Sequence, residues 1–374
     1  MGGDIMAIHI KEFNIGAFKG IENLSLKELN HINILTGDNN TGKTSVLELL
    51  YTINNPEQLK YWYSNRLGLY SYKGMPYNYL INLFPVDYGL EHSINYRYTD
   101  CYDAEHRVDV LGEIEELLMT QQEIMKYEYE TLTGKTVDNM TFGEKDEINR
   151  VIEIKKLNIN IKKDLSTGNT LNIFDFESRL RSSLISNNEF KITYISPVAH
   201  SEITPLNISN ILSSRDLSEE MIAILQEFDE NIININAIER NGYVEYMVMT
   251  KNHKNALPLN FYGDGMKKAL LLLSSMLYSK DGVLLLDEFE TAIHTSAMDH
   301  IFSWLLNSAL KLNVQVFLTS HSKEAINKVL RCDKEICDKI SYYTLFNYEG
   351  KNLVRKLSCD DAIKLQDQGG MDIR

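Results

Sequence analysis

The stretch Gly37-Asp38-Asn39-Asn40-Thr41-Gly42-Lys43-Thr44 decides the fold, because it fits the phosphate-binding pattern G-x-x-x-x-G-K-[ST]. An apolar run precedes it, and the segment Ser45-Val46-Leu47-Glu48-Leu49-Leu50 after it predicts a helix. Backbone N–H groups of such a loop turn inward around a phosphate, and the dipole of the helix N-terminus favours the negative charge. This order of strand, loop and helix predicts that the chain binds a nucleoside triphosphate.

The pattern also predicts a role for each position of the loop. We expect Lys43 to reach the β- and γ-phosphates and to act in catalysis, and we expect the Thr44 hydroxyl to bind Mg²⁺. The remaining nucleotide contacts are expected from the loop and the first helical residues, namely Gly37, Asn39, Asn40, Thr41, Gly42 and Ser45.

Composition sets limits on the partners. The chain has 374 residues, of which 44% are hydrophobic, so it can bury a sizeable core. Its formal net charge of -14 argues against a broad basic surface for DNA. A local basic groove is not excluded, because charges farther apart than about 10 Å are screened at physiological salt. DNA binding is therefore unsupported by the net charge.

The sequence predicts a cytoplasmic, soluble protein with no membrane partner. We see no signal peptide and no stretch of 18 apolar residues that could span a bilayer. The four cysteines, Cys101, Cys332, Cys337 and Cys359, lack the spacing of a zinc site. We expect them to be buried or free thiols in a reducing cytosol.

Three regions are expected along the chain: residues 1–90, residues 91–190 as an inserted subdomain without a chemical motif, and residues 191–374. In the inserted region, residues 93–98 and 107–110 alternate like paired strands. Residues 113–129 predict an amphipathic helix, residues 144–163 an irregular charged segment, and residues 164–172 a loop.

The last region predicts regular structure again. Residues 191–197 are expected to form a strand, and residues 218–228 a helix capped by Ser218. Two further strands, residues 232–239 and 243–250, are joined at Asn241-Gly242, a dipeptide typical of hairpin turns.

A second acidic motif follows in Gly282-Val283-Leu284-Leu285-Leu286-Asp287-Glu288. An unbroken aliphatic run indicates a strand that is buried on both faces. At its end Asp287 can help to hold Mg²⁺, and Glu288 can orient or deprotonate an attacking water. Because the phosphate-binding loop is also present, we favour this interpretation over an ordinary strand end whose Asp and Glu face solvent.

Two more segments contribute candidate residues. The strand of residues 314–318 ends at Thr319-Ser320-His321-Ser322, where His321 could hydrogen-bond a γ-phosphate oxygen. Before the acidic strand, Gly263, Asp264, Gly265 and Lys267 stand at the start of the helix of residues 269–278 and form a second potential anion cradle.

In this order the motifs resemble the ATP-binding-cassette (ABC) type of AAA ATPase. The resemblance covers about residues 6–60 and 190–330 and is strongest to the stand-alone bacterial branch with the overcoming-lysogenization-defect (OLD) family and SMC-like repair ATPases. It implies that residues 37–44 are the Walker A loop, residues 284–288 the Walker B strand, residues 262–267 the signature loop and His321 the switch histidine. The signature departs from the common form, because Tyr262 stands where a serine usually contributes a hydroxyl.

The resemblance implies an α/β P-loop NTPase of the ABC ATPase type, with a mixed central sheet flanked by helices and an inserted, mainly helical or mixed subdomain. It also implies that two protomers sandwich ATP and Mg²⁺, one supplying Lys43, Thr44, Asp287, Glu288 and His321, and its partner residues 263–267. A homodimer or a higher even-numbered oligomer is therefore expected.

The family's roles imply a sensor or regulator in bacterial antiphage defence. About fifty residues follow His321, too few for the fused TOPRIM nuclease of some family members, so the effector, a nuclease for example, is expected on a separate chain. Two alternatives remain open: a slow or non-hydrolysing scaffold that sequesters a toxin-like partner, and an SMC-like DNA repair ATPase. A cassette of a membrane transporter is disfavoured, because its insertion would be untypical.

Overall fold

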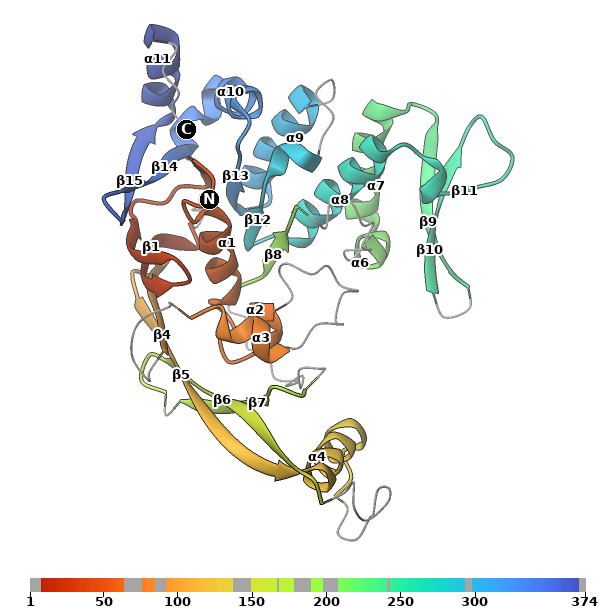
Figure 1. The fold of residues 1–374 in the computed structure, drawn as a ribbon. Coiled ribbons are helices and arrows are strands. Elements are labelled where there is room, and N and C mark those ends of the chain that lie inside the picture. The colour runs from red at the N-terminus through yellow and green to blue at the C-terminus, as the bar shows by residue number, and fades with distance from the viewer. Residues whose placement is uncertain are drawn as a thin grey trace.

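The structure, a computed structural model, describes residues 8–63, 76–84, 92–136, 149–166, 168–177, 190–197, 208–240, 243–292 and 298–369 (Figure 1). Among these residues the strands form three sheets. Two of them have six strands each and pack on either side of one helix, and the third is a small sheet beside them. This α/β architecture is the fold expected from the phosphate-binding loop.

The central sheet has the order β15-β14-β3-β13-β12-β8. Its strands are β15 (Lys351–Ser358), β14 (Ile340–Tyr348), β3 (Ile32–Gly37), β13 (Gln315–Thr319), β12 (Val283–Leu286) and β8 (Ile192–Ile195). All neighbours pair in parallel except β15, which is antiparallel to β14. The predicted strands before the phosphate-binding loop, before Asp287 and before His321 are thus confirmed as β3, β12 and β13, side by side.

Alternation along the buried strands gives the central sheet two apolar faces. In β12, Val283 and Leu285 pack with α1 (Lys43–Thr52), whereas Leu284 and Leu286 pack on the opposite side. That side is covered by α8 (Asp264–Tyr278), α9 (Met298–Lys311), α10 (Lys323–Arg331) and α11 (Cys359–Gly369). The unbroken aliphatic sequence of β12 therefore reflects burial on both faces.

A second, antiparallel sheet has the order β2-β1-β4-β5-β6-β7. It consists of β2 (Ile21–Leu26), β1 (Ile10–Phe18), β4 (His92–Asp100), β5 (Glu105–Thr120), β6 (Val151–Lys163) and β7 (Asn169–Phe174). Figure 1 shows β5 and β6 leading away from the body to α4 (Gln121–Thr133) at their far end. The expected pairing of residues 93–98 with 107–110 is confirmed in β4 and β5.

Two expectations in this region are wrong. The predicted helix of residues 113–129 is strand as far as Thr120, where β5 pairs with β6 over its whole outer length. The helix begins only after Thr120, whose side chain and that of Glu123 form a reciprocal capping box. The segment of residues 144–163, expected to be irregular, carries β6 from Val151 onward, and β7 begins inside the expected loop of residues 164–172.

The small third sheet consists of β9 (Ile232–Arg240), β10 (Tyr243–Thr250) and β11 (Leu257–Pro258). It shares a core with α6 (Ile208–Leu212), α7 (Arg215–Phe228) and α8. The antiparallel pairing of β9 with β10 is confirmed, but the expected turn at Asn241-Gly242 lies outside the described residues. Ser218 is not the helix cap, because α7 starts one turn earlier and its N-cap is Ser214.

Strand β4 pairs directly with β1, so residues 92–174 extend the N-terminal sheet. Its described part consists of strands and the single helix α4. The division into residues 1–90, 91–190 and 191–374 stays a prediction. Short helices complete the described fold: α2 (Leu59–Tyr63), α3 (Pro76–Ile81) and the 3₁₀ turns η1 (Leu259–Phe261), η2 (Phe289–Ala292) and η4 (Lys334–Lys339).

The expectation of buried or free thiols is wrong for two of the four cysteines. Cys337 and Cys359 form a disulfide that links η4 to the start of α11, whereas Cys101 and Cys332 are not joined to another cysteine in the described part of the chain. The two cysteines of the disulfide are 22 residues apart in the sequence, and their sulfurs meet only in the folded chain. Their spacing therefore does not predict the disulfide. None of the helices in the described ranges has both the length and the apolar character needed to span a bilayer.

Candidate nucleotide site

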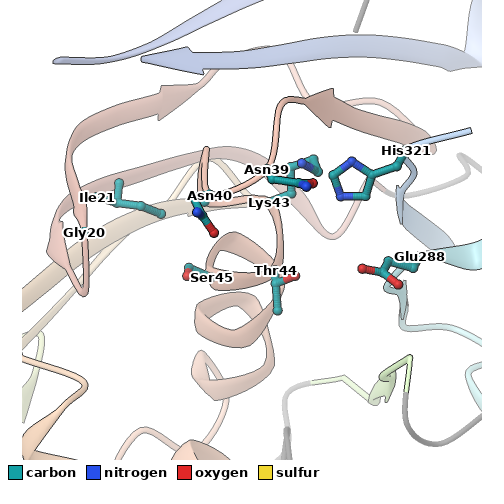
Figure 2. A pocket seen from close by; sticks show the side chains of 10 residues that line it. Gly20, Ile21, Asn39, Asn40, Lys43, Thr44, Ser45, Glu288 and His321 are labelled. Atoms are coloured by element: carbon teal, nitrogen blue, oxygen red, sulfur yellow. The ribbon is translucent and has the colours of Figure 1, made fainter. Parts of the chain in front are cut away.

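The parallel arrangement of β3, β13 and β12 brings their carboxyl ends to one edge of the central sheet. A cavity of about 630 Å³ opens there. Figure 2 shows its lining: Gly20, Ile21, Asn39, Asn40, Gly42, Lys43, Thr44, Ser45, Glu288 and His321. The structure thus joins the predicted loop to the predicted Glu288 and His321, although almost 250 residues separate the loop from Glu288.

Backbone geometry explains the glycines of the loop. Gly37 has φ 138° and Gly42 has φ 98°, in a region that side chains with a Cβ rarely adopt. A Cβ on Gly37 would lie 2.0 Å from the carbonyl oxygen of Leu345, and one on Gly42 would lie 2.7 Å from Ile21 Cδ1. The Thr41 hydroxyl donates to the carbonyl of Asp38 across the turn, at 2.9 Å. These contacts hold the loop curved around the cavity.

Lys43 lies under this loop. Its Nζ donates to the carbonyl oxygens of Gly37 at 2.9 Å and Asp38 at 2.8 Å, and the residue is only 5% exposed. Burial lowers the pKa of the Lys43 ammonium, although the carboxylates of Asp287 and its neighbours act in the opposite direction. A buried cation that donates to two backbone carbonyls is well placed to exchange them for phosphate oxygens.

Asp287 is fixed by three hydroxyl groups. Its Oδ1 accepts from Thr319 Oγ1 at 2.5 Å and from Thr44 Oγ1 at 3.2 Å, and its Oδ2 accepts from the Tyr194 hydroxyl at 3.1 Å. Burial, and then the Asp287 charge, raise the pKa of Tyr194 well above its ordinary value, so this phenol stays a donor. A carboxylate and a hydroxyl held side by side are the hard oxygen ligands that Mg²⁺ prefers, so Thr44 and Asp287 fit the ion.

Glu288 follows at the end of β12 in a left-handed conformation, with φ 47°. Its N–H donates to Thr319 Oγ1 at 2.8 Å, so the same threonine positions both carboxylates. Burial raises the pKa of Glu288, as do the charges of Asp287 and Glu290, while His321 and Lys43 lower it. Non-glycine residues with such φ values occur where strain is tolerated for function, and here the turn directs Glu288 into the cavity.

His321 enters the cavity from the loop between β13 and α10. Figure 2 shows His321 and Glu288 together at one end of the lining, with Gly20 and Ile21 at the other. The backbone N–H of His321 donates to Glu290 Oε1 at 2.8 Å. The predicted switch histidine and the predicted catalytic glutamate therefore share one end of the site.

The expected signature loop lies outside this cavity. Gly263 is the N-cap of α8, and Asp264, Gly265 and Lys267 occupy its first turn. Lys268 Nζ donates to the carbonyl of Thr291 at 2.6 Å, which places this turn beside η2, on the edge of the sheet that carries the cavity. Apart from the chain neighbours and the backbone of the same helix, no atom of the described residues lies within 4 Å of a Cβ added to Gly263 or Gly265.

Tyr262, at the position where a serine is usual, takes part in the packing of this region. Its ring packs against the core formed by α7, α8 and the small sheet, and burial raises the pKa of its phenol. The loop instead exposes the backbone of Gly263 and Gly265.

The sequence patterns do not predict five residues of the site: Gly20 and Ile21, which line the cavity, and Thr319, Tyr194 and Glu290, which hold its groups in place. Thr319 could have been found, because it ends the strand next to the one that carries Asp287. Tyr194 and Glu290 carry no sequence signal for these contacts, since their partners lie 93 and 31 residues away. Within the described residues no group of three His, Cys, Asp or Glu side chains forms a protein-only metal site.

Comparison with known families agrees with this geometry. Residues 143–327 match the family described as "AAA domain, putative AbiEii toxin, Type IV TA system", and residues 8–67 match "Protein of unknown function (DUF2813)". An ATP/GTP phosphatase of Helicobacter pylori is 25% identical over 332 residues, which are 85% of this chain and 86% of that protein.

A second relative is an uncharacterized protein of Methanocaldococcus jannaschii. It is 35% identical over 116 residues, 30% of this chain but 98% of that protein, so the two belong to one family. Among solved structures, an SMC head bound to the C-terminal winged-helix domain of ScpA covers 95% of this chain and 99% of its own, with 12% identity and a TM-score of 0.47. The SMC head domain from Thermotoga maritima covers 94% and 99%, with 11% identity and a TM-score of 0.41.

The phosphate-binding loop, the acidic strand and the histidine loop meet in one cavity, and residues 143–327 match an ATPase domain family. The chain is therefore a P-loop ATPase, and its residues 143–327 are similar to the AAA domain of that family.

Proposed function

We propose that two copies of the chain close around ATP and Mg²⁺, hydrolyse the nucleotide, and so switch a separately encoded effector in bacterial antiphage defence. The observation that carries the proposal is the division of the site. Lys43, Glu288 and His321 reach the cavity within one protomer, whereas the glycines at the start of α8 lie outside it with open space around them.

Hydrolysis is supported by the roles that the geometry allows. Lys43 would place its charge against the β- and γ-phosphates, and Glu288 would accept a proton from the attacking water. His321 would donate a hydrogen bond to the γ-phosphate and lose that partner after cleavage. The name ATP/GTP phosphatase of the Helicobacter pylori relative points to the same activity.

Thr44 and Asp287 would hold Mg²⁺, which when bound neutralises charge on the phosphates. The two side chains already lie 3.2 Å apart, and Thr319 and Tyr194 keep the Asp287 carboxylate oriented before any ion binds. The protein therefore supplies a preorganised pair of ligands, and the nucleotide would supply others.

Dimerisation is supported by Gly263 and Gly265. Neither glycine has a positive φ or a neighbour that a methyl group would strike, so the fold of one protomer does not require glycine at either position. Close approach of a phosphate to the backbone does require it. A second copy would bring these residues, with Asp264 and Lys267, across the γ-phosphate, so the oligomer would have an even number of chains.

The link to defence rests on the motif resemblance and on the matching family, whose description names a toxin of a type IV toxin–antitoxin system. The motif resemblance supports a cytoplasmic switch that controls a toxic partner, such as a nuclease, whereas the family description applies the word toxin to the AAA domain itself. An alternative is a scaffold that sequesters that partner while hydrolysing slowly or not at all. A DNA repair ATPase is the other alternative, and the net charge of -14 disfavours it.

The decisive experiment compares the wild type with Glu288→Gln. We expect the wild type to turn over ATP and to be mostly monomeric after hydrolysis, and the Gln variant to form a stable dimer with ATP, measured by light scattering. Background turnover in both proteins, with ATP still bound, would favour the scaffold. Turnover that rises only with DNA would favour the repair ATPase, and a monomer in every state would refute the dimer.

A further inference from the structure

Glu290 joins two parts of the site that are far apart in the sequence. It lies in η2, two residues after Glu288, and its Oε1 accepts the backbone N–H of His321 at 2.8 Å and that of Ser322 at 3.2 Å. One carboxylate oxygen thus receives two adjacent amides from the loop that carries the switch histidine. Hydrogen bonds to a charged acceptor are about twice as strong as neutral ones.

These contacts are not needed to start α10. Ser322 is the N-cap of that helix, and its own hydroxyl accepts from Ala325 N at 3.2 Å. The N–H groups of His321 and Ser322 precede the helix, so a folding role at the helix end is already filled by Ser322. Glu290 acts instead on the loop that ends at the cavity.

The second carboxylate oxygen of Glu290 has an unfavourable environment. Oε2 is buried and accepts no hydrogen bond among the described residues. A buried acceptor without a partner is unfavourable and calls for an explanation. Because Oε1 holds the backbone of His321 in place, we attribute the burial of this carboxylate to the positioning of that residue.

We propose that Glu290 is a positioning residue that holds the backbone of His321 against the turn that carries Glu288. Through this clamp the group that contacts the γ-phosphate and the group that activates water keep a fixed separation. When the γ-phosphate leaves, a movement of His321 is transmitted to Glu288 through Glu290. The inference rests on the proposed function for the roles of His321 and Glu288, but the clamp itself is a property of the nucleotide-free chain.

The first readout therefore needs no nucleotide. Hydrogen exchange is followed by mass spectrometry in a peptide that spans His321 and Ser322, in the wild type, Glu290→Ala and Glu290→Gln. We expect the Ala variant to exchange the His321 amide about tenfold faster, because local opening of that amide no longer breaks its bond to Glu290. The Ser322 N–H also donates to Ser320 Oγ at 3.0 Å, so its exchange should change less. The Gln variant keeps an oxygen acceptor and should exchange within about twofold of the wild type.

The second readout is ATP turnover. Loss of a residue that orients a catalytic group costs about 10- to 100-fold, so kcat of Glu290→Ala should fall by that factor with KM nearly unchanged. Glu290→Gln should restore most of kcat. The matched control is Glu324→Ala on α10, where the side chain is 59% exposed and pairs with Lys328 on the surface. This control should match the wild type in both readouts.

Unchanged exchange in Glu290→Ala would overturn the clamp, as would a Gln variant that exchanges as fast as the Ala variant. If Glu290→Ala does not fold, Glu290→Asp decides the question, because it keeps the charge but withdraws the acceptor by one methylene. Full turnover in Glu290→Ala beside an inactive Glu288→Gln would refute the coupling alone. Absent turnover in the wild type would refute the proposed hydrolysis, while the exchange result would still test the clamp.

Discussion

Replacing Gly263 by alanine tests whether the glycine is needed for the fold of one protomer or for the closed dimer. Gly263 has φ -62° and ψ 157°, an ordinary extended conformation that alanine adopts without strain. An added Cβ would meet no described atom within 4 Å. The substitution should therefore leave the free energy of unfolding unchanged or raise it by about 0.4–1 kcal/mol, because alanine lowers the entropy of the unfolded chain.

The same methyl group should be costly in the dimer. It would stand where the partner's γ-phosphate approaches the backbone, and a displacement of about 1 Å at a reacting centre can cost about 100-fold in rate. We expect Gly263→Ala to bind ATP as a monomer with wild-type affinity, and to lose about 100-fold in kcat and the ATP-dependent dimer of the Glu288→Gln background.

The assays are urea unfolding, ATP titration calorimetry, steady-state turnover and light scattering. Gly37→Ala provides the contrast, because φ 138° and a carbonyl oxygen 2.0 Å from its new Cβ should lower both stability and ATP affinity. Wild-type turnover in Gly263→Ala would refute the assignment of this loop to the partner's phosphate. A loss of stability in that variant would refute the description of Gly263 as open.

Three further predictions concern the cavity. Thr319→Val should lower the free energy of unfolding by about 2 kcal/mol, measured by urea unfolding, because the buried Glu288 N–H loses its acceptor and Asp287 loses a donor; an unchanged midpoint would contradict the shared threonine. Lys43→Ala should abolish ATP binding in calorimetry with little loss of stability, since burial already disfavours the charged ammonium; retained affinity would contradict its role. Removal of metal by EDTA should abolish turnover, and added Mg²⁺ should restore it; metal-independent turnover would argue against Thr44 and Asp287 as ligands.

The sequence predicts the centre of the fold better than its margins. The loop at Gly37, the aliphatic strand before Asp287 and the strand before His321 are local patterns, and the structure places them side by side. The Glu, Leu and Met residues in the outer part of β5 favour a helix, so the sequence predicts one there. Pairing with β6 overrides that preference, although the Thr120-Gln121-Gln122-Glu123 capping box could have marked the true helix start.

Within the site, the groups that touch the ligand carry motifs, whereas the groups that hold them do not. Lys43 and Glu288 are recognised because phosphate chemistry restricts both their type and their spacing. Tyr194 and Glu290 act through contacts with residues that only the folded chain brings near, so neither spacing nor residue type reveals them. The same reason hides the disulfide between Cys337 and Cys359.

The paired sheet that leads from the cavity to α4 has a mechanical consequence. Gly20 and Ile21, at the turn between β1 and β2, line the cavity, and β1 is hydrogen-bonded through β4 to β5. Ala17 of β1 pairs with Asn95, and Asn95 pairs with Asp109, so the cavity end of β1 is level with Asp109 of β5. From there to Thr120 the strand runs about 36 Å at roughly 3.3 Å per residue. A rigid-body rotation on the order of 15° at this point would carry the start of α4 through about 9 Å, so a small movement beside the cavity would become a large one at α4.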